Sequence, residues 1–194
     1  MLLALAYSIL RWNSIKNKPE RWIVLFLFTT VMLEIPAFYL KSIESKIIVF
    51  NNIIILITNS ILMYWFYEYT RKKNVLIVSI VVILISFIVN SFFSSFLYKI
   101  YHFPNFIISI LLIINTIIYF RTLLLRNEVL TYYKEPAFWI SLGILVYQLI
   151  LASIFFLLSK KLIAANINMY VSVLGVISFI LYSSFTYGIS LNKK

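Results

Sequence analysis

Six long apolar stretches occupy most of the 194-residue chain. They are residues 22–40, 47–67, 75–97, 105–125, 137–158 and 167–190. Each stretch has about 20 residues, which as a helix matches the hydrocarbon thickness of a bilayer. Backbone polar groups in lipid must be satisfied within the protein, and a helix does this within a single segment. The stretches therefore predict transmembrane helices.

The composition supports the same class of protein. Hydrophobic residues make up 63% of the chain, the mean hydropathy is +0.99, and charged residues account for 12%. In soluble proteins about a quarter of the residues are charged. The 17 Lys and Arg residues lie in short segments between the apolar stretches rather than in one cluster, which argues against a nucleic-acid partner.

A shorter apolar run, Leu2–Leu10, precedes the six stretches. As a helix it would be about 14 Å long, half the thickness of the hydrocarbon core. Its basic residue, Arg11, follows the run, whereas a signal peptide begins with basic residues. We interpret the segment, over about residues 2–12, as a first membrane helix whose start is missing. A short helix at the membrane surface is the alternative.

The predicted fold is an all-α polytopic bundle of about seven helices that forms a single domain over residues 1–194. Segments after the first, third, fifth and seventh helices hold twelve Lys and Arg residues, and the opposite side holds five. Basic residues accumulate on the cytoplasmic side of a membrane. We therefore expect an outside N-terminus and a cytoplasmic C-terminus in a bacterial inner membrane. Tryptophans gather at the same predicted edge, as an aromatic belt does: Trp12, Trp22, Trp65 and Trp139.

Polar residues within the apolar stretches are the candidate functional residues. Glu34 is an acidic residue well inside a stretch, two residues before Pro36, and an ionisable group in lipid is costly unless it is paired or neutral. Counting from the turn near Ser42 puts Glu34 at the depth of Asn51 and Asn52. We predict an outward-facing polar cavity lined by Glu34, Asn51, Asn52, Asn90, Asn115 and Gln148.

The alternative for these residues is structural. Asn and Gln side chains in membrane proteins often hydrogen-bond neighbouring helices without any further function. Small residues permit close helix packing in the same environment. Gly143 and Gly175 are interpreted as such packing positions.

Several kinds of chemistry find no support in the sequence. The chain has no cysteine, and its six acidic residues are all glutamate, so it has no aspartate. His102 is the single histidine, and one histidine without Cys or Asp does not form a typical metal site. No catalytic motif or glycine-rich phosphate loop occurs. We expect neither an enzyme, nor a metal, nor another cofactor.

The segment Lys134–Tyr147 reads K-E-P-A-F-W-I-S-L-G-I-L-V-Y. It resembles the penultimate helix of small membrane proteins of Bacteroidota that carry an E-P-x-F-W-I-S-x-G-x-L-x-Y segment. Those proteins look like stand-alone versions of the membrane input part of sensor histidine kinases. The resemblance implies a sensory role and a membrane-bound kinase partner.

We therefore expect a non-catalytic sensory input or accessory module for a membrane signalling partner such as a histidine kinase. Beyond the lipid bilayer, such a module needs a contact surface for that partner. The candidate contact residues lie at the predicted cytoplasmic edge: Glu135, Pro136, Phe138 and Trp139. The alternative function is a small transporter or permease-like protein that uses Glu34 as a proton or cation site.

Overall fold

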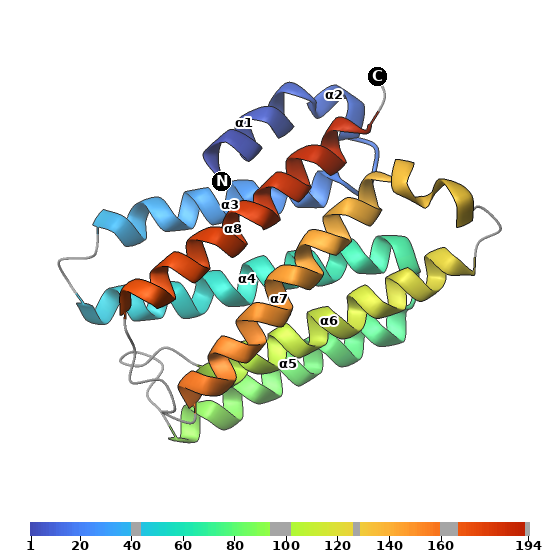
Figure 1. Ribbon diagram of the computed structural model, residues 1–194. Coiled ribbons are helices and arrows are strands. Elements are labelled where there is room, and N and C mark those ends of the chain that lie inside the picture. Colours follow the sequence, from blue (N-terminus) through green and yellow to red (C-terminus); the bar gives the residue numbers. More distant parts are fainter. Residues whose placement is uncertain (40–43, 94–101, 126–128, 160–166, 193–194) are drawn as a thin grey trace.

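The computed structural model describes residues 1–39, 44–93, 102–125, 129–159 and 167–192. Within these ranges the chain is helical and has no strand, which confirms the all-α prediction. The helices are α1 (Leu2–Leu10), α2 (Trp12–Ile15), α3 (Arg21–Tyr39), α4 (Glu44–Thr70), α5 (Lys73–Phe93), α6 (His102–Leu124), the 3-10 helix η2 (Val129–Lys134), α7 (Pro136–Ser159) and α8 (Ile167–Ser190) (Figure 1).

Four of these helices are long and apolar enough to cross a membrane. They are Lys73–Phe93, His102–Leu124, Pro136–Leu157 and Ser172–Ser190. Large apolar side chains also cover the outer faces of the bundle, as in α5, where Val78, Ile85 and Ile88 are exposed. Apolar groups on both the inner and the outer faces are expected of helices surrounded by lipid. By length and composition the chain is a membrane protein.

The predicted stretches coincide with α3 to α8, with differences at their ends. Helix α4 runs from Glu44 to Thr70, three residues beyond the predicted stretch at each end. The predicted ends at Leu40 and Leu97 lie outside the described residues. The first helix is shorter than predicted, because α1 ends at Leu10 and a separate short helix, α2, follows Arg11.

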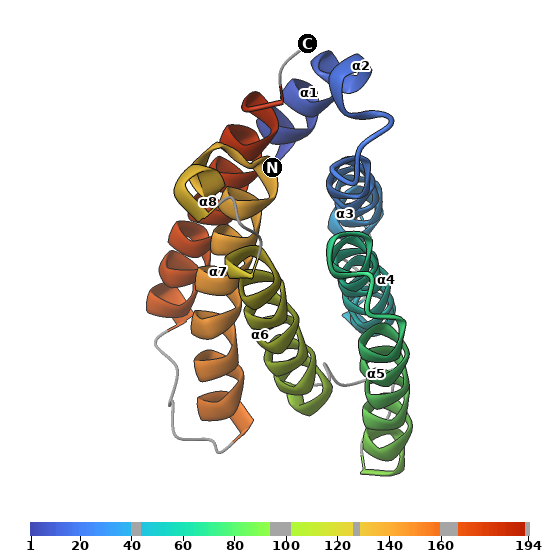
Figure 2. The same cartoon turned by 90° about the vertical axis from the view of Figure 1, so that its right-hand side faces the viewer.

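The long helices form two layers that face each other (Figure 2). Helices α3, α4 and α5 form one layer, and α6, α7 and α8 form the other. The layers meet where α6 packs against α4 and α5. At another edge, α1 packs against both α3 and α8 and so links the two layers.

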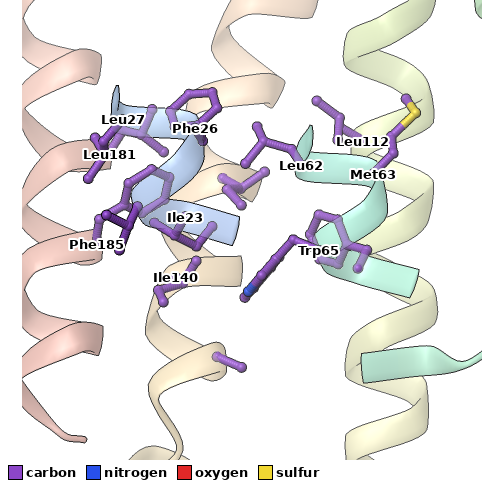
Figure 3. Close-up of a cluster of buried hydrophobic side chains, with 14 of the residues drawn as sticks. Ile23, Phe26, Leu27, Leu62, Met63, Trp65, Leu112, Ile140, Leu181 and Phe185 are labelled. Carbon is purple, nitrogen blue, oxygen red and sulfur yellow. The ribbon is translucent and has the colours of Figure 1, made fainter. Parts of the chain in front are cut away.

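Apolar side chains from both layers share one core (Figure 3). Trp65 and Phe66 of α4 and Phe185 of α8 are among the largest fully buried side chains. The side chains labelled in the close-up are Ile23, Phe26, Leu27, Leu62, Met63, Trp65, Leu112, Ile140, Leu181 and Phe185. This core fixes the position of α3 and α4 relative to α6, α7 and α8.

Two glycines permit the close approach of α7 and α8. A Cβ atom at Gly188 would lie 2.8 Å from the Pro136 carbonyl oxygen and 2.7 Å from Ile140 Cγ1. At Gly143 it would lie 2.6 Å from Ser184 Cβ. The predicted packing role of Gly143 is therefore confirmed. The same prediction for Gly175 is wrong, because a Cβ there would meet no atom of the described residues within 4 Å.

A pair of substitutions on α8 tests this packing. Gly188→Ala should lower the free energy of unfolding by about 1–3 kcal/mol, the usual cost of overpacking, because a backbone oxygen of Pro136 blocks the new methyl group. Gly175→Ala is the control and should leave stability unchanged or slightly higher, since alanine favours helix. Unfolding in mixed micelles measures both. Equal effects of the two substitutions would contradict the close approach.

Candidate polar cavity between the helix layers

A cavity of about 270 Å³ lies between α3 and α4 on one side and α6, α7 and α8 on the other. Its apolar walls come from Phe26, Ile54, Ile55, Leu62, Ile108, Ile144, Leu151, Phe155, Leu174 and Leu181. Its polar lining consists of Thr30, Glu34, Thr58, Asn59, Asn105, Ser109, Tyr147, Gln148 and Tyr182. Both helix layers therefore contribute polar groups to one space inside an apolar bundle.

Glu34 marks the open edge of the cavity. Its side chain lines the cavity and is also exposed at the surface of the bundle. On the opposite layer, Tyr182 lies within electrostatic range of both Glu34 and Tyr147. A carboxylate and two phenol groups thus lie near one another where α3 faces α7 and α8.

Some of the polar lining residues bond to their own helix. Thr30 Oγ1 donates to the Phe26 carbonyl, Thr58 Oγ1 to the Ile54 carbonyl and Asn59 Nδ2 to the Ile55 carbonyl, each at 2.7 Å. Such bonds to the carbonyl four residues earlier satisfy a side chain without a neighbouring helix. The hydroxyl hydrogens of Thr30 and Thr58 are therefore already donated within their own helices.

Asn105 is different because it has no such bond. It is 3% exposed, and both its Nδ2 and its Oδ1 atoms are buried without a hydrogen-bond partner among the described residues. A buried polar group without a partner costs roughly 1–3 kcal/mol. Gln148 on α7 brings a second carboxamide to the same cavity and is also buried. The cavity therefore presents two carboxamides, of which that of Asn105 has unused hydrogen-bonding capacity.

The structure brings only part of the predicted set together in this cavity. Glu34 and Gln148 lie in its lining, whereas Asn51, Asn52, Asn90 and Asn115 are not among the lining residues. Asn51 and Asn90 are half-buried elsewhere on α4 and α5, and Asn52 is fully buried within α4. The depth count grouped these residues because it compares only their positions along the helices. It does not show which way each side chain turns.

Asn115 has a structural role, which was the alternative interpretation of the polar residues within the helices. Its Nδ2 donates to Ser79 Oγ at 3.2 Å, from α6 to α5, and to the Leu111 carbonyl at 2.8 Å. This contact joins the two helices where the layers meet. Asn105, by contrast, was assigned from sequence only as the start of a predicted span. Its position one residue after Pro104 marked a helix boundary and gave no signal of a binding role.

A second polar cluster lies where the start of α3 meets the end of α4. Glu20 is 2% exposed, and Tyr69 Oη donates to its Oε1 atom. Burial, together with the charge and hydrogen bond of Glu20, raises the pKa of the Tyr69 phenol, which lies beyond the predicted span 47–67. Tyr69 therefore remains protonated and is the donor. Nearby, Glu68 forms an ion pair with Arg71 at 3.1 Å.

The candidate partner contact lies at this same end. Trp139 Nε1 donates to the Tyr133 carbonyl at 2.8 Å, and the Trp139 ring packs edge-on against Tyr187 at 5.0 Å. Phe138 packs between Phe120 and Tyr132, with centroid distances of 5.7 and 4.8 Å. These aromatic rings hold η2 against α7.

Glu135 and Pro136 of the same predicted contact are half-buried, and Pro136 is the first residue of α7. The exposed rings in this region are those of Tyr132 and Tyr133 in η2 and of Tyr187 in α8. Most of the predicted contact residues thus have contacts within the chain. A surface for a partner here consists mainly of η2 and the outer edge of Trp139.

The chemistry that the cavity offers is binding. Its lining supplies one carboxylate, carboxamides and hydroxyl groups. Among the described residues there is no group of three or more His, Cys, Asp or Glu side chains that could hold a metal ion. The amides of Asn105 and Gln148 and the carboxyl group of Glu34 are among the groups available to a bound molecule.

Two asparagines of α6 test the difference between an unpaired amide, at Asn105, and an amide that joins two helices, at Asn115. Asn115→Leu should lower the free energy of unfolding by about 0.6–1.7 kcal/mol, the range for interhelical hydrogen bonds in membranes, because Ser79 loses its partner. Asn105→Leu should leave stability unchanged or raise it, because it removes two unpaired atoms. Unfolding in mixed micelles measures both variants. A larger loss at Asn105 than at Asn115 would show that Asn105 is a structural residue.

Comparison of the chain with protein-family models, with curated proteins and with solved structures finds no match. The residues and the geometry described above are therefore the basis for a function. The polar cavity between the two helix layers is the feature that carries it.

Proposed function

We propose that the chain is a multi-pass protein of a bacterial inner membrane, with seven helices, an outside N-terminus and a cytoplasmic C-terminus. The distribution of charge supports this orientation. Helix α3 begins at Arg21, the turn between α4 and α5 contains Arg71 and Lys72, and η2 ends at Lys134. These basic residues share one end of the bundle, which the positive-inside rule places in the cytoplasm.

Within that membrane the protein acts as a non-catalytic sensory input or accessory module for a signalling partner. The observation that carries this function is the cavity walled by both helix layers. A molecule bound there contacts α3 and α4 as well as α6, α7 and α8. It would favour one spacing of the layers over another, which is how a ligand shifts a conformational equilibrium.

Such a change reaches a partner through the helix ends. Helix α7 lines the cavity through Tyr147 and Gln148 and begins at Pro136, beside η2. A shift of α7 would therefore move η2 and the rings packed on it. Exposed tyrosine and tryptophan rings are frequent at protein interfaces, so η2 with Trp139 is the surface we assign to a membrane-bound histidine kinase.

Site-specific crosslinking in native membranes tests the partner. A photoreactive residue at Tyr133, which is 49% exposed in η2, should form an adduct with a membrane-bound histidine kinase. The control is the same residue at Ile85, which is 52% exposed on the outer face of α5 and should yield lipid adducts. Lipid adducts alone at both positions, or the same proteins at both, would contradict the sensory function.

A transporter is the second candidate, and the position of Glu34 favours it. A carboxylate at the open edge of a cavity between two three-helix layers is a suitable site for a proton or cation. This candidate requires ion-coupled uptake by the purified protein in liposomes. Loss of such uptake in Glu34→Gln would replace the sensory function with transport.

A further inference from the structure

The hydrogen-bonding pattern of Asn105 restricts what can occupy the cavity. Its Nδ2 donor and Oδ1 acceptor lie side by side, and both lack a partner among the described residues. A carboxamide is complementary to another group that carries an acceptor beside a donor, such as a primary amide or a lactam. Two parallel hydrogen bonds would then satisfy both atoms at once.

The charge of the lining restricts the occupant further. Glu34 is the acidic side chain among the described lining residues, and it is exposed. No Lys or Arg side chain is among these residues to balance an anion. A carboxylate ligand would have to give up its hydration without an opposite charge, at a high cost. The deeper part of the cavity, where Asn105 is buried, therefore suits an uncharged molecule.

The size and the apolar walls of the cavity also restrict the occupant. A volume of about 270 Å³ lies just below the range of pockets that hold drug-sized ligands. Apolar side chains such as Ile108, Ile144 and Leu151 form much of the wall. The space suits a molecule with a compact apolar body and a single polar group.

We propose that the cavity binds a small uncharged molecule with a carboxamide-like group, which pairs with the Asn105 carboxamide. Gln148, on the facing helix α7, is the second polar contact. The proposal rests on the sensory function above, for which it names the chemical class of the signal. It can fail separately, because binding is measured on the purified protein without a partner, whereas crosslinking measures the partner without a ligand.

Three probes of similar size and different charge test the ligand class: benzamide, benzylamine and benzoate. Thermal unfolding of the protein in lipid nanodiscs is followed at increasing concentrations of each, since a ligand that binds the native state raises the midpoint. Benzamide should raise it with saturation, more strongly than the benzylammonium cation or the benzoate anion. The charged probes separate amide recognition from charge, and saturation separates binding from partition into lipid.

Variants test whether benzamide binds at the Asn105 carboxamide. Asn105→Leu should weaken benzamide binding by about tenfold or more, as expected when a paired amide is lost. Gln148→Leu is a second cavity variant and should also weaken it. Asn115→Leu, whose amide bonds Ser79 outside the cavity, should bind benzamide like the unaltered chain.

Three outcomes would overturn the proposal. The absence of a saturable benzamide effect in the unaltered chain would mean a cavity that holds water only. Equal benzamide affinity in Asn105→Leu would place the binding elsewhere. Preference for benzylamine, abolished by Glu34→Gln, would identify a cation site at the open edge instead.

Discussion

The need to satisfy polar groups without water determines this structure. Helices satisfy the backbone within each segment, which is why the described residues contain no strand. Side chains follow the same rule where Thr30 and Thr58 bond to their own helix and Asn115 bonds to Ser79. Asn105 departs from it, since both of its amide atoms are buried and unpaired among the described residues. Because Asn105 also lines the cavity, we assign its amide to binding rather than to packing.

The remaining architecture keeps the cavity between two packed layers. Close contact at Gly143 and Gly188 joins α7 to α8, and the layers meet along α6. Away from the open edge, the buried bond between Glu20 and Tyr69 ties the start of α3 to the end of α4. The cavity lies where the layers face each other without this close packing. Bound molecules would therefore act on the spacing of the layers.

The sequence predicted the helices well and the cavity in part. Hydropathy and length located α3 to α8 to within a few residues, because the thickness of a bilayer sets both. The polar lining depends on the rotation of each helix, which depth counting does not give. Glu34 and Gln148 line one cavity, whereas Asn115 is an interhelical contact and Asn105 had been assigned as a helix boundary. An unpaired amide is visible only once its neighbours are positioned.

The central claim is that a polar space open to small molecules lies between the layers. Cysteine accessibility tests it most directly, since the chain has no cysteine of its own. Ser109 lines the cavity and the adjacent Ile110 is exposed on the outer face of α6, so the two lie at similar depth. In membranes, Ser109→Cys should react with methyl methanethiosulfonate, a small uncharged reagent, because thiolate forms in a hydrated space, and Ile110→Cys in lipid should not. Equal reaction of both cysteines, or a failure of Ser109→Cys to react, would contradict the presence of such a space.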